Sequence, residues 1–219
     1  MKNRFEKYII DNQLFMKNDK LLVAVSGGVD SVVLCQLLYD CGFNFSIAHC
    51  NFQLRGDESD GDETFVKSLT DRWKVPILTK KFETKQFALA HKLSIQVAAR
   101  DLRYAWFEEL RTSLNYDYIL TAHHASDNIE TVIYNFTKGS GLLGLTGIKP
   151  KNKTIIRPLL WAKKEEIVAF LKAKNLPFQE DSSNDSDKYA RNKIRHHVIP
   201  VLKEINSNFE NTANETIKR

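Results

Sequence analysis

The chain has 219 residues, of which 42% are hydrophobic and 27% are charged, and its formal net charge is +5. This size and composition suit a globular domain whose core needs neither disulfides nor a structural metal, and the modest positive charge permits a polyanionic partner without requiring one. No run approaches the ~20 apolar residues of a membrane span, and the three cysteines lack metal-ligand spacing. We therefore predict a cytoplasmic protein with no membrane partner.

Short apolar runs alternate with helical patterns along the chain. The runs at residues 21–25, 45–49, 76–82, 118–124 and 154–160 predict five strands. Helices are expected at 30–38, from about Ser59 onwards and at 95–111. Such alternation predicts an α/β fold of the doubly wound, Rossmann type with a mostly parallel sheet. In that architecture ligands bind at the carboxyl ends of the strands.

The first predicted strand runs directly into a helix through a glycine-containing turn. Its six residues are Ser26, Gly27, Gly28, Val29, Asp30 and Ser31. The glycines allow positive φ and leave no Cβ between backbone amides and an anion, and the free N–H groups of the helix attract phosphate. Asp30 would repel phosphate unless a divalent cation lies between them. A simple capped turn is the alternative, but the complete string favours a nucleotide-phosphate site that also holds Mg2+.

Two other nucleotide signatures fail. No Walker-type G-x-x-x-x-G-K-[ST] string exists in the sequence. Residues 139–144 match G-x-G-x-x-G, but they follow a helical pattern rather than a strand, so the context of a dinucleotide fingerprint is missing. We interpret this segment as a flexible glycine-rich loop that is able to move over a substrate.

A second polar cluster, residues 123–131, follows the fourth predicted strand and opens a helix. An apolar stripe at i, i+3, i+4 and i+7 predicts the buried face of this helix: Ile129, Val132, Ile133 and Phe136. Asp127 and Glu130 fall on the opposite side, one turn apart and close to His123. Asp127 alone could be a helix cap, whereas the whole cluster favours metal coordination or orientation of an amine nucleophile.

These strings resemble a known family. The string SGGVDS after a first strand is similar to the signature of the PP-loop ATP pyrophosphatases, which adenylate a carbonyl-type oxygen and release pyrophosphate. The string HHASDNIET resembles the H-H-x-x-D-x-x-E-T pattern of tRNA(Ile)-lysidine synthetases. Further positions agree in the family's order, over about residues 18–202: Leu54, Arg55, 58–60, Ala99, Arg100, Arg103, Tyr104, Leu145, 156–159, 180–184 and 191–195.

The resemblance implies a reaction. In it, O2 of the wobble cytidine of a CAU-anticodon tRNA(Ile) attacks the α-phosphate of ATP, and the ε-amine of L-lysine then attacks C2 and expels AMP. Residues 26–31 would bind the phosphates, and Asp30 with Asp127 would bind Mg2+. Glu130 and Arg103 would orient lysine or substrate, and His123 would polarise the base or transfer a proton. A basic strip would contact tRNA phosphates through Arg191, Lys193 and Arg195.

The chain departs from the family pattern after the second strand. The family usually has a second His and a Gly where this chain has Phe52 and Gln53, so no role is carried to these two residues, and His49 is compatible with a structural role. An Arg that is common before the glycine loop is Lys138 here. Lysine keeps the charge but loses the bidentate fork.

Two other functions stay open. A PP-loop tRNA thiolase would use cysteines, and Cys50 lies near a strand end although no C-x-x-C exists. A non-catalytic ATP- or RNA-binding module is the other alternative. As domains we expect a catalytic domain at 1–205, with residues 181–184 as a turn and helix cap. A polar tail or linker at 206–219 would lead towards C-terminal domains absent from this chain.

Overall fold

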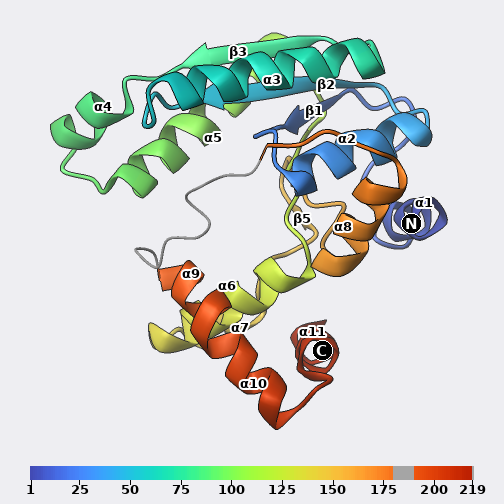
Figure 1. Ribbon diagram of the computed structural model, residues 1–219, viewed down its shortest axis with the longest axis vertical. Helices are drawn as coiled ribbons and strands as arrows, with labels where there is room; N and C mark the ends of the chain where they lie inside the picture. The colour runs from blue at the N-terminus through green and yellow to red at the C-terminus, as the bar shows by residue number, and fades with distance from the viewer. Residues whose placement is uncertain (180–189, 219) are drawn as a thin grey trace.

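A six-stranded sheet organises the protein in the computed structural model, which describes residues 1–179 and 190–218 (Figure 1). The strand order is β3-β2-β1-β4-β6-β5, and neighbouring strands are parallel except for the antiparallel pair β5–β6. The strands are β1 (Leu21–Ala24), β2 (Phe45–Asn51), β3 (Ile77–Lys81), β4 (Tyr118–Leu120), β5 (Lys151–Asn152) and β6 (Ile155–Ile156). This architecture confirms the predicted α/β fold with a mostly parallel sheet.

The strands differ from the prediction at the far side of the sheet. β4 ends at Leu120, because the following residues leave the sheet to form part of the candidate site. β6 spans only two residues, and β5 was not predicted since its exposed Lys151 and Asn152 carry no apolar alternation. The two strands join through Lys153, which takes a left-handed φ of 53°.

Helices flank the sheet and continue beyond it. They are α1 (Lys2–Asp11), α2 (Val29–Asp40), α3 (Asp57–Trp73), α4 (Thr84–Ala90), α5 (Ile95–Ser113), α6 (Ala125–Thr137), α7 (Leu142–Leu145), α8 (Lys164–Ala173), α9 (Ala190–Lys193), a π-helical turn η2 (Ile194–Val198), α10 (Ile199–Ile205) and α11 (Phe209–Lys218). Within the described ranges no helix is long and apolar enough to cross a membrane. Residues 181–184, predicted to form a turn and cap, lie outside the described residues.

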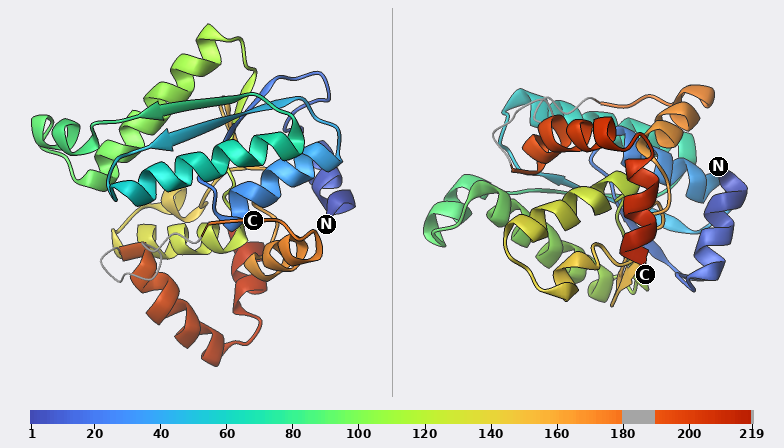
Figure 2. Two further views of the ribbon diagram at one scale, coloured as in Figure 1. Left: turned by 45° about the horizontal axis from the view of Figure 1, so that its top comes forward. Right: turned by 90° about the horizontal axis from the view of Figure 1, so that it is seen from below.

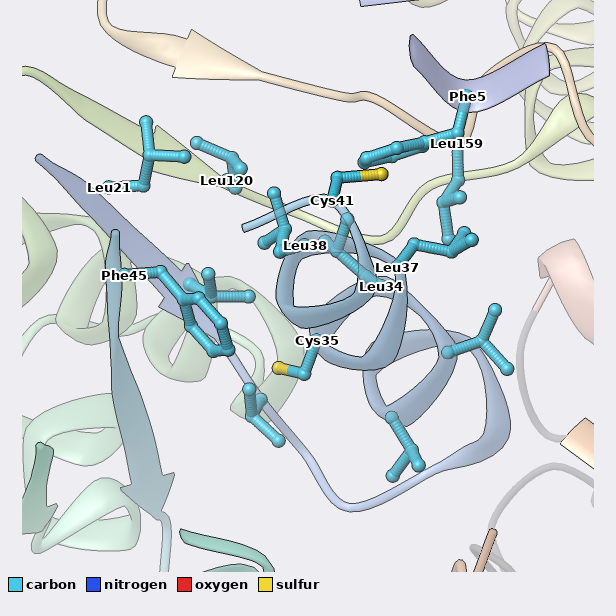
Figure 3. Packing of buried hydrophobic residues seen from close by; sticks show 14 of the residues in the cluster. Phe5, Leu21, Leu34, Cys35, Leu37, Leu38, Cys41, Phe45, Leu120 and Leu159 are labelled. Carbon is cyan, nitrogen blue, oxygen red and sulfur yellow. The ribbon is translucent and has the colours of Figure 1, made fainter. Parts of the chain in front are cut away.

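Alternating side chains of the strands build two cores. On β1, Leu21 and Val23 face the helices α1, α2, α3 and α8, whereas Leu22 faces α5 on the other side. Figure 2 shows α2 and α3 on one side of the strands and α5 on the other. Helix α2 is buried almost all round, and Figure 3 shows its Leu34 and Leu38 in the cluster that also holds Leu21. Helix α2, which follows the phosphate loop, is therefore anchored in the core.

The strand order reverses at β1. The chain passes from β1 to β2 on one side and returns to β4 on the other, and both neighbours are parallel to β1. Such a switch point opens a crevice at the carboxyl ends of β1 and β4. The two polar clusters found in the sequence, residues 26–31 and 123–131, follow these two strands.

The C-terminal segment is folded, which corrects the expectation of a polar tail after residue 205. Phe209, Ala213 and Ile217 recur every four residues on α11 and pack on the cluster around Ile129 of α6. This spacing forms a narrow apolar stripe in an otherwise polar helix. In Figure 1, α6, α9, α10 and α11 gather at the end of the molecule opposite β3.

The predicted stripe of α6 is correct in its first half and wrong at its end. Ile129 is buried and Ile133 is partly buried, but Phe136 is 71% exposed. The partners that cover α6 contact Ile129, Ile133 and Tyr134, and Phe136 lies past them in the last turn. By contrast, Trp106 and Phe107 of α5 are buried core residues.

The glycine-rich segment, interpreted from the sequence as a flexible loop, contains a short helix and is hydrogen-bonded to α6. It includes the short helix α7, and the α6 side chain of Asn135 contacts its end while that of Asn128 contacts the turn that follows. Asn135 Nδ2 donates to the Gly144 carbonyl (2.8 Å), and the Ile148 N–H donates to Asn128 Oδ1 (2.6 Å). Gly147 lies at φ +64°, where an added Cβ would overlap Asn128 Oδ1.

This anchor predicts an asymmetry between two glycines. Gly147→Ala should lower the free energy of unfolding by about 2–4 kcal/mol, because positive-φ strain adds to the clash with Asn128. Gly139→Ala is the matched control: its φ is +71°, but an added Cβ would meet nothing within 4 Å, so only about 1 kcal/mol should be lost. Urea unfolding of both variants measures the difference, and equal losses would contradict the anchor.

Candidate functional site

A large pocket occupies the crevice at the carboxyl ends of β1, β2 and β4. Its volume is about 1460 Å3, which exceeds the roughly 300–1,000 Å3 of ordinary small-molecule sites. Both sequence clusters line it, the first through Ser26, Gly28, Val29, Asp30 and Ser31, and the second through His123, His124, Ser126, Asp127 and Glu130. The pocket therefore has room for a nucleotide together with a second substrate.

Hydrogen bonds within the phosphate loop pre-shape it. The Gly28 N–H donates to Ser26 Oγ (3.3 Å), and Ser31 Oγ donates to the Gly28 carbonyl (3.0 Å). The two hydroxyls lie 3.4 Å apart. These contacts keep the turn open at the amino end of α2, where unpaired N–H groups and the helix dipole favour an anion.

Gly27 has a different role from the rest of the loop. Its φ is +95°, and a Cβ there would come within 3.2 Å of Phe65 and 3.3 Å of Val66, both on α3. Its carbonyl accepts a hydrogen bond from the Gln179 N–H (3.0 Å), which ties a distant segment to the loop. Gly27 is therefore required for close packing against α3 and is not a pocket-lining residue.

Asp30 faces the pocket from the first turn of α2. Its Oδ1 accepts a hydrogen bond from Lys164 Nζ (2.6 Å), and its Oδ2 lies 3.8 Å from His124 Nε2. Lys164, at the start of α8, was not singled out in the sequence, because one lysine in a run of charged residues carries no signal. Asp30 is thus paired with a lysine in a site that otherwise attracts phosphate.

His123 follows β4 and lies beside the hydroxyl of Thr121. His123 Nδ1 lies 2.9 Å from Thr121 Oγ1. Burial lowers the pKa of His123 to about 4, and Arg157 and Arg191 act in the same direction while Asp127 opposes them. His123 is therefore neutral near pH 7, and a neutral imidazole can accept or donate a single proton.

Asp127 serves both as a cap and as a wall of the pocket. Its Oδ2 accepts a hydrogen bond from the His124 N–H (2.9 Å) and lies 3.6 Å from His124 Nε2. Burial would raise the pKa of Asp127, but the neighbouring His124 and His123 and the His124 N–H hold it below its ordinary value. The carboxylate therefore remains ionised near pH 7.

Glu130 is more buried than the sequence indicated. Its side chain is only 2% exposed, and both its oxygens accept hydrogen bonds from Arg195, at 2.6 and 3.0 Å. Arg195 also lies 3.6 Å from Asp127. Burial raises the pKa of Glu130, and the guanidinium acts in the opposite direction. Helix η2 therefore closes one side of the pocket through a bidentate ion pair.

The remaining predicted basic residues fall in different places. Arg103 of α5 lines the pocket, whereas Arg100 stacks over Tyr104, with 4.8 Å from the guanidinium carbon to the ring centroid. Arg191 is exposed at the pocket, and Lys193 is exposed on the same short helix. Of the three residues predicted to contact tRNA, Arg195 alone is turned towards the carboxylates.

The sequence reading also gave no individual role to Arg157. This residue follows β6, is only 8% exposed and donates from Nη1 to the Lys149 carbonyl (2.7 Å). Its Nε is buried without a hydrogen-bond partner among the described residues. A buried guanidinium near His123 favours the neutral imidazole. In the sequence, the only feature that marked Arg157 was the Arg-Pro pair that follows an apolar run.

Mg2+ fits the acidic residues of this pocket. No group of three acidic, histidine or cysteine side chains gathers as a metal site in the part of the chain that the structure describes. Mg2+, however, is commonly held by one or two carboxylates together with substrate phosphates. Asp30 and Asp127 both approach His124 Nε2 and border the phosphate loop, so they provide that number of ligands.

Comparison with known proteins agrees with this geometry. The family model described as a PP-loop domain matches residues 1–202. The tRNA(Ile)-lysidine synthase of Bacteroides thetaiotaomicron is 43% identical over 216 residues, which cover 99% of this chain and 51% of that protein. The enzyme of the same name from Petrotoga mobilis is 39% identical over 93% of this chain and 67% of its own length. The chain belongs to the tRNA(Ile)-lysidine synthase family, through its PP-loop domain.

Solved structures show the same fold at low sequence identity. The tRNA thiolase NcsA from Methanococcus maripaludis superposes with a TM-score of 0.79 at 15% identity and covers 99% of this chain and 78% of that chain. The NH3-dependent NAD synthetase from Campylobacter jejuni gives a TM-score of 0.60 at 13% identity, over 99% of this chain and 90% of that chain. The chain spans about half the length of the first curated relatives that it matches.

Proposed function

We propose that this lysidine synthase domain carries out ATP-dependent ligation of L-lysine to C2 of the wobble cytidine of a CAU-anticodon tRNA(Ile). The products are lysidine, AMP and pyrophosphate, formed through an adenylated tRNA. The observation that carries the proposal is that one pocket joins the phosphate loop to the cluster from His123 to Glu130. The three free cysteines, two of them buried, suit a reducing cytoplasm.

The phosphate loop would bind and orient ATP. Backbone N–H groups at the start of α2 and the hydroxyls of Ser26 and Ser31 are the donors available to phosphate oxygens. Asp30 and Asp127 would hold Mg2+, which when bound neutralises charge on the phosphates. Lys164 contacts Asp30, so it is also close enough to contact a phosphate of ATP when ATP binds.

His123 would act on the cytosine. A neutral imidazole near pH 7 can donate one hydrogen bond to the base or accept a proton that leaves the attacking amine. The hydrogen bond with Thr121 Oγ1 fixes the ring orientation and leaves Nε2 for the substrate. Its position on the pocket wall beside Asp127 supports this role.

Glu130 would receive the lysine ammonium. A carboxylate that is 2% exposed attracts a cation more strongly than one in water, because little solvent screens it. Arg195 already pairs with this carboxylate and lies 3.6 Å from Asp127. The lysine ammonium would therefore be a second cation beside the two acidic side chains, Glu130 and Asp127. Arg103 would contact an anionic group of the substrate across the pocket.

The anticodon loop would enter at the mouth of the pocket. Arg191 lines the pocket and Lys193 lies close by, and both are exposed, so they can reach phosphates of the RNA backbone. Arg195 would act differently from these two, by holding η2 against α6. The catalytic unit would comprise residues 1–205, with α11 packed against it.

The thiolase alternative is less well supported. The curated relatives at 39–44% identity carry the lysidine synthase name, and the thiolase likeness at 15% identity shows the fold alone. Burial also raises the pKa of the Cys50 thiol to about 12 and that of Cys41 to about 11. Thiols this weakly acidic are poor nucleophiles.

The direct test is analysis of the reaction product. The chain is incubated with ATP, Mg2+, L-lysine and a CAU-anticodon tRNA(Ile), and the digested nucleosides are examined by mass spectrometry. We expect lysidine to appear at the wobble position only when both ATP and lysine are present. The matched control is the same tRNA with uridine at the wobble position. ATP binding without any product, or a sulfur-containing nucleoside in a parallel reaction that also contains sulfide, would contradict the proposal.

A further inference from the structure

Phe52 directly follows β2, and its ring contacts both Phe82 and Arg103. It stacks on Phe82 with a centroid distance of 5.6 Å and an interplanar angle of 21°. The guanidinium carbon of Arg103 lies 5.2 Å from the Phe52 centroid. Both Phe52 and Arg103 line the large pocket. An aromatic pair therefore supports the one arginine of α5 that lines the pocket.

Arg103 is held differently from Lys164 and Arg195, two other cations of the pocket. Lys164 and Arg195 each contact a carboxylate, at 2.6 Å from Asp30 and 2.6 Å from Glu130. Arg103 forms neither an ion pair nor a side-chain hydrogen bond to any part of the chain that the structure describes, and the Phe52 ring is its contact. A cation held by a ring is fixed in place without losing its net charge, so it stays available to an anion.

The backbone at Phe52 is held firmly. The buried Asn51 accepts the Gln53 N–H at Oδ1 (3.0 Å) and donates from Nδ2 to Asp60 (2.7 Å) and Glu63 (3.0 Å). The Phe52 carbonyl accepts a hydrogen bond from Thr84 (2.8 Å). Gln53 takes a left-handed φ of 52°, a conformation that favours glycine.

We propose that Phe52 is a positioning residue for Arg103. The Phe52 ring, and not a carboxylate, supports the guanidinium of Arg103. The positive charge of Arg103 is therefore not offset by a neighbouring anion and is directed at a phosphate group of the substrates. That phosphate belongs either to ATP or to the RNA backbone, and the two are distinguished by measurement. The inference concerns how the site works and rests on the proposed function for its kinetic test.

The kinetic test compares variants that keep or remove the ring. Phe52→Leu should raise KM roughly 3- to 30-fold for whichever substrate Arg103 contacts, the range expected from loss of a cation–π contact, with little change in KM for the other two. Phe52→Tyr should restore near-wild-type KM. Phe170→Leu is the matched control, since it removes a partly buried ring lying 5.8 Å from the Lys174 ammonium outside the pocket. ATP titration in pyrophosphate exchange and tRNA titration in binding assays identify the phosphate.

The Phe52→His variant adds a signature that a purely structural role would not give. A neutral imidazole can still support Arg103, but a protonated one repels it, so KM should rise as pH falls below about 6.5. The wild type and Phe52→Tyr should show no such change. A pH profile of Phe52→His identical to that of the wild type would overturn the proposal.

A spectroscopic test separates this inference from the function. The ring should shift the Nε–H resonance of Arg103, assigned through Arg103→Lys, and the shift should be lost in Phe52→Leu but kept in Phe52→Tyr. If the shift is present while no lysidine forms, the proposed function fails and the positioning contact stands. If the resonance is unaffected by Phe52→Leu in a folded protein, the positioning role is wrong.

Discussion

Asp30→Ala should reduce tRNA-dependent pyrophosphate release by about 100- to 1,000-fold, the loss typical when one preorganised electrostatic contact to reacting phosphates is removed. Asp30 is the acidic residue in the first turn of α2, beside a loop that otherwise attracts phosphate. A carboxylate in that position is unfavourable for ATP binding unless a cation complements it. Its removal should therefore affect the chemistry and the Mg2+ requirement together.

The fold should tolerate this substitution. The side chain of Asp30 is 30% exposed and its partner Lys164 is 41% exposed, and such pairs contribute only about 0–1 kcal/mol. Asp40→Ala is a matched control, because it removes an Asp–Lys pair (2.9 Å to Lys174) from the other end of α2, away from the pocket. It should leave pyrophosphate release unchanged.

Asp30→Asn separates metal binding from the contact with Lys164. The amide oxygen can still accept the hydrogen bond from Lys164 Nζ, but it lacks the charge that attracts a divalent cation. We expect this variant to need a higher Mg2+ concentration for half-maximal pyrophosphate release. Normal release and a normal Mg2+ dependence in folded Asp30→Asn would show that the carboxylate does not bind the metal.

The sequence predicted the parts of the fold that depend on local patterns. The continuous apolar run at residues 21–25 predicted a buried strand, and Leu21 and Leu22 do pack on opposite faces of the sheet. The phosphate loop is contiguous, and its glycines and its strand and helix are neighbours in the chain. For the same reason the pocket at the switch point followed from the order of the elements.

Contacts between distant residues could not be read in this way. Lys164 meets Asp30 across 134 positions, and Arg195 meets Glu130 across 65. Neither pair has a sequence spacing that marks it, since only the packing of α8 and η2 brings the partners together. The sequence therefore assigned Arg195 to RNA and Glu130 to a polar helix face, whereas the structure joins their side chains.

Helix faces were predicted correctly only where the covering element was known. Without α11 as a packing partner, the stripe on α6 extended naturally to Phe136, which is exposed. Once Phe209 and Ile217 are placed against α6, the covered face shifts towards Ile133 and Tyr134. Periodicity identifies an apolar face, but the partner determines how far along the helix that face is buried.

Glu130→Gln should raise the KM for lysine by about 10- to 100-fold, because hydrogen bonds to charged groups contribute roughly 1.5–3 kcal/mol. The substitution keeps the shape and removes the charge that would offset desolvation of the ammonium. The KM for ATP should change little, since the phosphate loop is untouched. Adenylation should continue, so the tRNA–AMP intermediate should accumulate at low lysine, where quenched-flow analysis can detect it.

Because Glu130 also pairs with Arg195, a double-mutant cycle is needed to interpret this result. If Glu130 acts only as the anchor of Arg195, then Arg195→Met alone should reproduce the effect of Glu130→Gln, and the double variant should be no worse. If Glu130 binds lysine, Glu130→Gln should still raise the lysine KM in the Arg195→Met background. Glu165→Gln provides the matched control, because this carboxylate lines the same pocket but is exposed. An equal rise in the ATP requirement, without accumulation of the intermediate, would instead place Glu130 with the metal ligands, since loss of a metal ligand impairs adenylation before lysine is needed.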